Sequence, residues 1–151
     1  MDKFNQLLEI AAETREVIES SGIYTSDLEG ACAVASEYIV QKARNLNIRA
    51  TFICGYYQVY DDEYVIDFDY KNCLNTNHSW IEYKNKIIDV TATQFAIFDT
   101  VHVVAKNYAK KYVAMLRGKK GIKFVNKVWP KEQQFKNVKN TLDLFWRRKT
   151  I

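Results

Sequence analysis

The sequence predicts an α+β domain in which two helices are followed by a largely antiparallel sheet and then by a terminal helix. Apolar residues recur at helical spacing in residues 2–19 and again in residues 30–45. After Asn47 the pattern becomes strand-like, and helical spacing returns in residues 133–148. Helices and strands that are segregated along the chain in this way indicate the α+β class.

The first predicted helix, residues 2–19, is amphipathic. Glutamates separate its apolar residues, and Ser20-Ser21-Gly22 is a typical stop signal. The second predicted helix, residues 30–45, has Ser26 or Asp27 as its expected N-cap. Its apolar stripe, which we expect to pack against the sheet, comprises Ala31, Ala35, Tyr38, Ile39, Ala43 and Leu46.

Strands are predicted where β-branched and aromatic residues gather. Residues 49–57, 63–68, 101–106 and 112–116 have this composition. Residues 78–83 and 86–91 flank Lys84-Asn85 and predict a β-hairpin with a two-residue turn. Because short turns join antiparallel neighbours, we expect the sheet to be largely antiparallel.

Length and composition bound the possibilities. The 151 residues fit a single domain, residues 1–151, and the composition, 48% hydrophobic and 26% charged, excludes a disordered chain. No apolar run approaches the roughly 18 residues of a membrane-spanning helix, and the acidic N-terminus does not resemble a secretion signal. Cys32, Cys54 and Cys73 cannot all pair within one chain and lack zinc-site spacing. We expect reduced thiols, a cytoplasmic location, no metal and no cofactor.

Charge is distributed unevenly along the chain. Residues 1–99 contain 8 Lys/Arg and 16 Asp/Glu, a net charge of −8, whereas residues 100–151 contain 14 Lys/Arg and 2 Asp/Glu, a net charge of +12. This asymmetry predicts either an anionic partner for the C-terminal third or a solvated lysine-rich surface.

Cys32 lies at the start of the second predicted helix. The positive end of the helix dipole favours thiolate over thiol at this position. Gly30, Ala31 and Ala33 are small, so the helix can pack closely and leave the sulfur reachable. A single cysteine here is equally typical of a buried apolar side chain, so Cys32 alone supports either a nucleophile or a core residue.

The hairpin adds a histidine and an aspartate. Its register sets Trp80 opposite Asp89 and His78 opposite Thr91. His78 and Asp89 then point to the same face as diagonal neighbours. Since an unpaired buried carboxylate is costly, we expect the two to pair, as a catalytic or a structural pair. The residues of the opposite face, which suit burial in the core, are Ser79, Ile81, Ile88 and Val90.

Short motifs surround these three residues in the order Cys, His, Asp. The first is Gly30-Ala31-Cys32-Ala33-Val34-Ala35, and the strand after it, within residues 46–57, ends in Gly-Tyr-Tyr. The others are His78-Ser79-Trp80-Ile81-Glu82 and Ile87-Ile88-Asp89-Val90-Thr91, continued by Thr93-Gln94-Phe95. With spacings of 46 and 11 residues between Cys32, His78 and Asp89, these motifs together resemble those of the transglutaminase-like superfamily.

This resemblance covers about residues 28–97 and implies a papain-like fold, with a basic C-terminal extension of about residues 100–151. It implies that Cys32 is the nucleophile, His78 the general base and acid, and Asp89 the orienting carboxylate. Such an enzyme attacks an amide or ester carbonyl and forms an acyl-thioester. A protein or peptide is the expected substrate. Peptidase, deamidase and transglutaminase-like activities use the same three groups, so all three stay open.

The expected oxyanion hole departs from the papain-like pattern, because no glutamine occupies residues 25–28 before the nucleophile. We expect the Cys32 N–H to be one donor and either Asn77 or Ser26 to be the second. Asn77 also suits a simple structural role at the start of its strand. Trp80 is expected to form a wall of the site.

Other polar residues are expected to have simpler roles. His102 lies in a strand pattern and is expected to be structural or exposed. The acidic residues 61–63, 67 and 69 lack the glycine-bearing spacing of a calcium loop, which favours a solvated turn. Lysines alternate with aromatic residues in residues 106–149, a composition compatible with nucleic acid. The alternative function is therefore a catalytically inactive papain-like module whose basic C-terminal third binds nucleic acid or an acidic protein.

Overall fold

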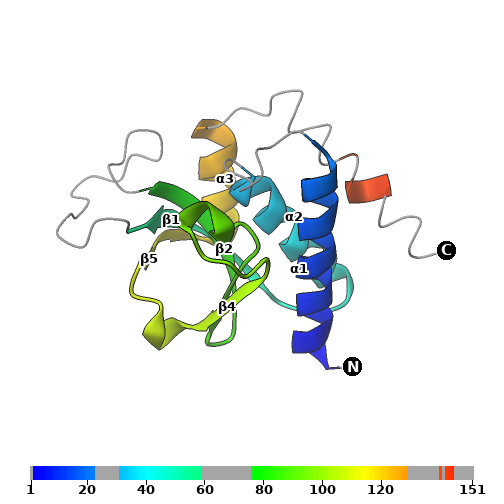
Figure 1. The fold of residues 1–151 in the computed structure, drawn as a ribbon, viewed down its shortest axis with the longest axis horizontal. Helices are drawn as coiled ribbons and strands as arrows, with labels where there is room; N and C mark the ends of the chain where they lie inside the picture. Colours follow the sequence, from blue (N-terminus) through cyan, green and yellow to red (C-terminus); the bar gives the residue numbers. More distant parts are fainter. Residues whose placement is uncertain (1, 23–30, 59–75, 129–139, 141, 145–151) are drawn as a thin grey trace.

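The computed structural model describes residues 2–22, 31–58, 76–128, 140 and 142–144. In this part of the chain, helices cover one face of an antiparallel sheet (Figure 1). The chain is therefore of mixed α+β type, as the sequence predicts. The elements in chain order are α1 (Lys3–Ser20), α2 (Cys32–Asn45), β1 (Thr51–Tyr57), β2 (Thr76–Tyr83), β3 (Lys86–Asp89), the 3₁₀ helix η1 (Ala92–Phe95), β4 (His102–Ala105), the 3₁₀ helix η2 (Lys106–Tyr108), β5 (Tyr112–Arg117) and α3 (Gly118–Val128).

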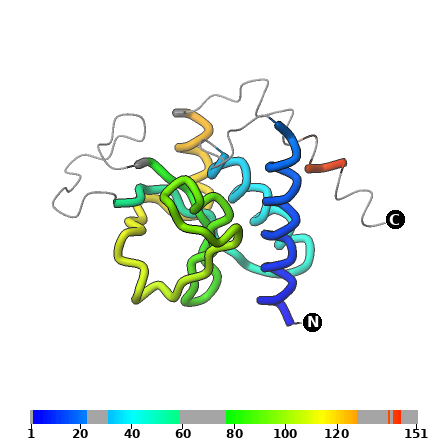
Figure 2. The backbone as a smooth tube through the Cα atoms, in the orientation of Figure 1, coloured from blue at the N-terminus to red at the C-terminus, as the bar shows by residue number. Residues whose placement is uncertain are grey.

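The sheet has the strand order β4-β3-β2-β1-β5, and each neighbouring pair is antiparallel. β1 is flanked by β2 and β5, while β4 and β5 form the two edges. In Figure 2 the chain can be followed from β4, at one edge of the sheet, to β5 at the opposite edge. The basic C-terminal third thus contributes both edge strands and α3, so that much of it is part of the same sheet structure.

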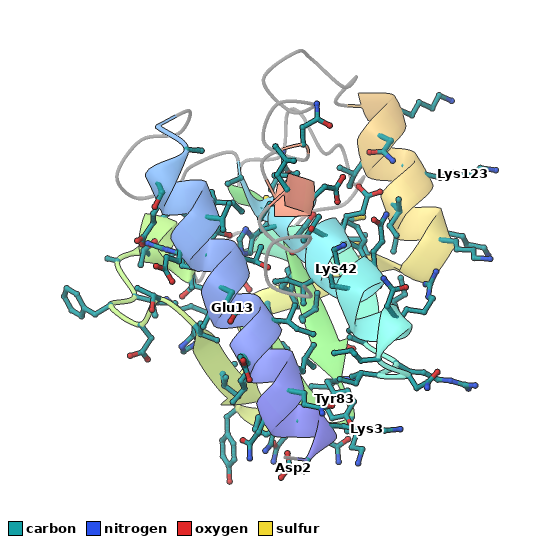
Figure 3. All side chains as sticks on the ribbon, turned by 90° about the vertical axis from the view of Figure 1, so that its right-hand side faces the viewer. Asp2, Lys3, Glu13, Lys42, Tyr83 and Lys123 are labelled. Atoms are coloured by element: carbon teal, nitrogen blue, oxygen red, sulfur yellow. The ribbon has the colours of Figure 1, made fainter. Side chains whose placement is uncertain are left out.

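The main core lies between the sheet and the helices. α2 packs on β1 and β2, α3 packs on β1 and β5, and α1 packs on α2. Figure 3 shows α1 and α2 side by side in front of the strands, with α3 beside them. Residues from every layer of this arrangement are buried, among them Leu7, Ile18, Ile39, Phe52, Ile81 and Ile88.

The opposite face of the sheet has a smaller apolar cluster. Ile53, Trp80 and Ile87 are buried there together with Ala109, which follows η2. His78 alternates with Ser79 along β2 and therefore shares this face with Trp80. The alternation predicted from the sequence is confirmed for the helix-facing side, where Ile81, Ile88 and Val90 are part of the main core.

The predicted hairpin is present, but its ladder is shorter than expected. Tyr83 pairs with Lys86, as the two-residue turn requires, and the last pair is Ile81 with Ile88. On its other side β3 pairs with β4, where Asp89 lies opposite His102. The predicted register is confirmed by the three pairs of the hairpin, but the predicted continuation, with Trp80 opposite Asp89 and His78 opposite Thr91, is not part of the ladder.

The ladder ends because the chain after Asp89 makes other hydrogen bonds. The Thr91 N–H donates to the Asp89 carboxylate, and the chain then enters η1. The Arg15 guanidinium donates to the Val90 carbonyl oxygen over 2.7 Å. The ladder between β2 and β3 therefore has no pair at Ser79.

Close backbone packing requires a glycine at position 55. A β-bulge separates Cys54 from Gly55 in the pairing of β1 with β5. A Cβ atom on Gly55 would lie 2.0 Å from the Val113 carbonyl oxygen, a backbone atom that cannot move aside easily. Gly55 is also the cross-strand partner of His78, so no β1 side chain lies directly opposite the imidazole.

Two further predictions differ from the structure. α2 begins at Cys32, two residues later than predicted, with Ala31 at the N-cap position, while the predicted cap residues Ser26 and Asp27 lie outside the described part of the chain. α3 was not predicted, because two glycines and four lysines weaken its helical pattern.

Some predictions fall on residues outside the described part of the chain. The strand at residues 63–68 and most of the terminal helix at residues 133–148 are among them. Of that helix, Asn140 and residues 142–144 are helical, and Leu142 is buried in the main core.

Candidate active site

The structure brings His78 and Asp89 into direct contact. The His78 Nε2 atom lies 2.6 Å from Asp89 Oδ2, and both side chains are essentially inaccessible to solvent. This contact assigns Nε2 of the imidazole to Asp89. Nδ1 is therefore the nitrogen that remains for other partners.

The Asp89 carboxylate is fully hydrogen-bonded. Oδ1 accepts from the Thr91 N–H at 3.0 Å and from the Thr91 hydroxyl at 3.3 Å, while Oδ2 also accepts from the Tyr112 hydroxyl at 2.8 Å. Burial alone raises the pKa of a carboxyl group, but the charge and hydrogen bond of His78, with the Thr91 and Tyr112 bonds, lower the pKa of Asp89 below its ordinary value. Asp89 is therefore an anion at neutral pH.

Cys32 meets His78 at the first residue of α2. Its thiol hydrogen-bonds with the His78 side chain and with the backbone of Ser79, whose N–H is the donor group. Since Asp89 occupies Nε2, the imidazole faces the sulfur through Nδ1. Both partners of the thiol, His78 and Ser79, lie on β2 beyond the last pair of the hairpin ladder.

The charges of this cluster favour a thiolate beside an imidazolium. Burial opposes ionisation of the Cys32 thiol, but the hydrogen bond and charge of His78 and the hydrogen bond of Ser79 outweigh it and lower the thiol pKa. Burial also lowers the pKa of His78, yet the Asp89 charge and hydrogen bond raise that pKa to about 10. Between the lowered Cys32 pKa and about pH 10, both groups are charged.

Aromatic rings enclose the imidazole. Phe95 contacts His78 edge-on with ring centroids 4.7 Å apart, and Tyr112 lies at 6.2 Å. Trp80 lies at 5.9 Å and is 1% exposed, so it walls the His78 pocket from inside the protein. Tyr57 stacks on Phe95 at 4.2 Å. These rings keep water away from the His78–Asp89 pair, which strengthens the electrostatic contact.

Three polar contacts of the cluster were not predicted from the sequence. Gln94 of η1 places Nε2 3.1 Å from His78 Nδ1. Tyr112 reaches Asp89 from an edge strand. Arg15 of α1, 5% exposed, holds the segment after Asp89 through the Val90 carbonyl and the Thr93 hydroxyl. Arg15 lies at a core-facing position of an amphipathic helix, and a charged residue there was an available signal.

The remaining candidates have different surroundings, and two of them, a serine and a cysteine, lie outside the described part of the chain. Asn77 has a buried Oδ1 atom without a hydrogen-bond partner in the described structure. Ser26 lies outside the described residues, as does Cys73. His102 is the cross-strand partner of Asp89 and stacks on Tyr112, but its Nδ1 faces Asp99 at 3.7 Å.

Cys54 is the cross-strand neighbour of Ser79 in the main core. Burial raises the pKa of its thiol to about 11. It is therefore a neutral thiol at the pH at which Cys32 is ionised, and it provides an internal reference for cysteine reactivity.

Neither a metal site nor a membrane span is found in the described ranges. No group of three or more His, Cys, Asp or Glu side chains among these residues is arranged to hold a metal ion. None of the helices there has the length and apolar character needed to cross a bilayer. The acidic residues 61–63, 67 and 69 lie outside the described part.

Comparison of the chain with protein-family models, curated proteins and solved structures found no match. The resemblance to the transglutaminase-like superfamily therefore rests on the motifs of this chain and stays a prediction. The chemistry of the site has to be argued from its own geometry.

Proposed function

We propose that the protein is a cysteine-dependent acyl-transfer enzyme of the papain-like, transglutaminase-like type, with Cys32, His78 and Asp89 as its catalytic residues. The observation that carries this proposal is the continuous set of contacts from the Cys32 sulfur to the imidazole and on to the Asp89 carboxylate. A purely structural role of the His78–Asp89 pair would not explain why the Cys32 thiol, at a helix N-terminus, hydrogen-bonds with the same imidazole. The lowered pKa of that thiol is the property that a nucleophile requires.

The first half of the reaction forms an acyl-enzyme. The Cys32 thiolate attacks the carbonyl carbon of an amide or ester, and the carbonyl oxygen becomes an oxyanion. His78 Nδ1–H then gives its proton to the leaving nitrogen or oxygen as the bond to carbon breaks. The products are an acyl-thioester on Cys32, a neutral amine or alcohol, and a neutral imidazole.

The second half regenerates the enzyme. The neutral His78 takes a proton from water or from an acceptor amine, which attacks the thioester. The sulfur leaves as a thiolate beside the restored imidazolium. Asp89 keeps the imidazole in one orientation and stabilises its positive charge in both halves. Water yields hydrolysis or deamidation and an amine yields acyl transfer, with a protein or peptide as the expected acyl donor.

Acylation by p-nitrophenyl acetate tests this proposal without knowledge of the natural substrate. We expect release of p-nitrophenol and an acetyl adduct on Cys32, which acid quenching preserves and peptide mass spectrometry locates. The Cys32→Ala variant should release none above background, while Cys54→Ala should behave as the wild type. Acetylation of Cys32 at the same rate as Cys54 would contradict the proposal.

A second candidate function is supported by the surface of α3. Lys119, Lys120, Lys123 and Lys127 are exposed and share one side of the helix, and residues 118–128 contain no Asp or Glu. Lys123 points outward from α3 in Figure 3. Such a surface suits a binding module for nucleic acid. A salt-dependent shift of mixed-sequence RNA or DNA, lost in Lys119→Glu/Lys123→Glu, together with an unreactive Cys32, would favour this function over catalysis.

A further inference from the structure

Gln94 contacts His78 but has no role in the reaction steps described above. It lies on η1, directly after the segment that Arg15 holds in place. Its side chain is half-buried, whereas His78 and Asp89 are fully enclosed. Its Nε2 atom lies 3.1 Å from His78 Nδ1, the ring nitrogen that Asp89 does not occupy. A neutral amide donor therefore stands beside the point at which the substrate carbonyl would be attacked.

We propose that the Gln94 side-chain amide is the second donor of the oxyanion hole, together with the Cys32 N–H. This inference rests on the proposed function. The first turn of α2 supports it, because the N–H groups of that turn have no intrahelical acceptor and Ala31 provides no side-chain cap. The Cys32 N–H and the Gln94 amide belong to two different elements, α2 and η1.

The proton balance at Nδ1 explains how the amide becomes available. Gln94 can donate to Nδ1 only while that nitrogen is unprotonated. When Nδ1 carries the proton of the Cys32 thiol, the ring nitrogen is itself a donor and no longer accepts from the amide. The Gln94 N–H is released in the same charge state in which the thiolate attacks, and the developing oxyanion is the acceptor within its reach.

Gln94 is also better placed than the residues that the sequence indicated. Asn77 has a buried amide oxygen without a hydrogen-bond partner in the described structure. By alternation along β2, Asn77 shares the helix-facing side with Ser79. Gln94 approaches from the side of the imidazole, where the leaving group must also be protonated.

Two reactions of Cys32 separate an oxyanion donor from a residue that only positions His78. Acylation by p-nitrophenyl acetate passes through an oxyanion, whereas alkylation by iodoacetamide displaces iodide from a saturated carbon and forms none. Removal of one oxyanion-hole donor costs about 10²–10³-fold in rate. In Gln94→Ala we therefore expect acylation to fall by about 10²-fold, with the rate and pH profile of Cys32 alkylation unchanged.

Two variants serve as matched comparisons. Gln94→Met keeps the approximate size of the side chain, has no N–H to donate and adds no charge beside His78, so it tests the same point if Gln94→Ala fails to fold. It should also slow acylation without slowing alkylation. Asn77→Ala removes the rival amide and should leave the ratio of the two rates at the wild-type value.

The outcomes are distinguishable. A selective loss of acylation in both Gln94 variants supports the inference. Equal loss of acylation and alkylation in the Gln94 variants would show that Gln94 only positions His78. A selective loss of acylation in Asn77→Ala alone would assign the donor to Asn77. Either result overturns the inference while the proposed function stands. A wild-type Cys32 that neither reagent modifies faster than Cys54 would remove the proposed function itself.

Discussion

Acylation of Cys32 by p-nitrophenyl acetate is expected to be about 10³-fold slower in His78→Ala than in the wild type, since a positioned general acid and base contributes roughly 10²–10⁴-fold. The loss has two causes. The variant has no group at Nδ1 to carry the proton, and Cys32 loses the positive charge that lowers its pKa while its burial remains. The thiol is then mostly protonated at neutral pH.

His102→Ala is the matched control for this experiment. His102 is the other histidine of the chain, pairs with Asp89 across β3 and β4, and stacks on Tyr112 at 6.4 Å. None of the contacts of Cys32 involves it. Acylation should therefore proceed at the wild-type rate in His102→Ala. If the two histidine variants lost the same activity, a general disturbance of the sheet would replace the assigned role of His78.

Replacement of Asp89 is expected to affect both activity and stability. In Asp89→Asn the charge that raises the His78 pKa is lost while burial, which lowers that pKa, remains. The imidazole becomes neutral at pH 7, the thiolate loses its counter-ion, and acylation should fall by about 10⁴-fold, as in other hydrolases that lose the orienting carboxylate. Asp99→Asn, whose side chain is 74% exposed, is the matched control and should react normally.

The stability effect is expected to depend on pH. Asp89→Ala leaves a buried His78 and the Tyr112 hydroxyl without their acceptor, which should lower the free energy of unfolding by about 3–5 kcal/mol at pH 7. The pKa of Asp89 is lowered in the folded state, so its contribution is fully present above the ordinary carboxyl pKa of about 4 and is lost as pH falls below it. Urea titrations of the wild type should therefore show little change in the free energy of unfolding between pH 7 and about 5, and a loss below about pH 4. The variant should lose stability already below the ordinary imidazole pKa of about 6.5, because its buried, unpaired His78 then has to take up a proton. A wild type that lost stability between pH 7 and about 5 as steeply as the variant would contradict an ionised Asp89 paired with His78.

The part of the site that follows from local pattern was predictable. The two-residue turn at Lys84-Asn85 sets the face of the hairpin, and with it the contact between His78 and Asp89. Helical spacing placed Cys32 near a helix N-terminus. These features depend on the period of side chains along a strand or a helix, which a sequence displays directly.

The rest of the site depends on contacts between residues that are distant in sequence. Tyr112 reaches Asp89 only because β5 crosses to the far edge beside β1, and no local pattern reports that crossing. Arg15 donates a hydrogen bond to the carbonyl oxygen of Val90, which lies 75 positions later in the chain. This contact holds the segment after Asp89, and the hairpin ladder ends before that segment. Gln94, which contacts the imidazole, follows in the same segment. Periodicity alone extends a strand until a turn residue appears, so it predicted a longer ladder.

The most direct test of the central claim, an ionised Cys32 paired with His78, is the pH dependence of its alkylation by iodoacetamide, measured by mass spectrometry against Cys54 and Cys73. The structure predicts fast, Cys32-selective labelling that persists well below the pKa of roughly 8.5 of a free thiol. Cys54, whose pKa is raised to about 11, should label slowly throughout. A Cys32 profile that rises only near pH 8.5, at a rate no greater than those of the other two cysteines, would contradict the account.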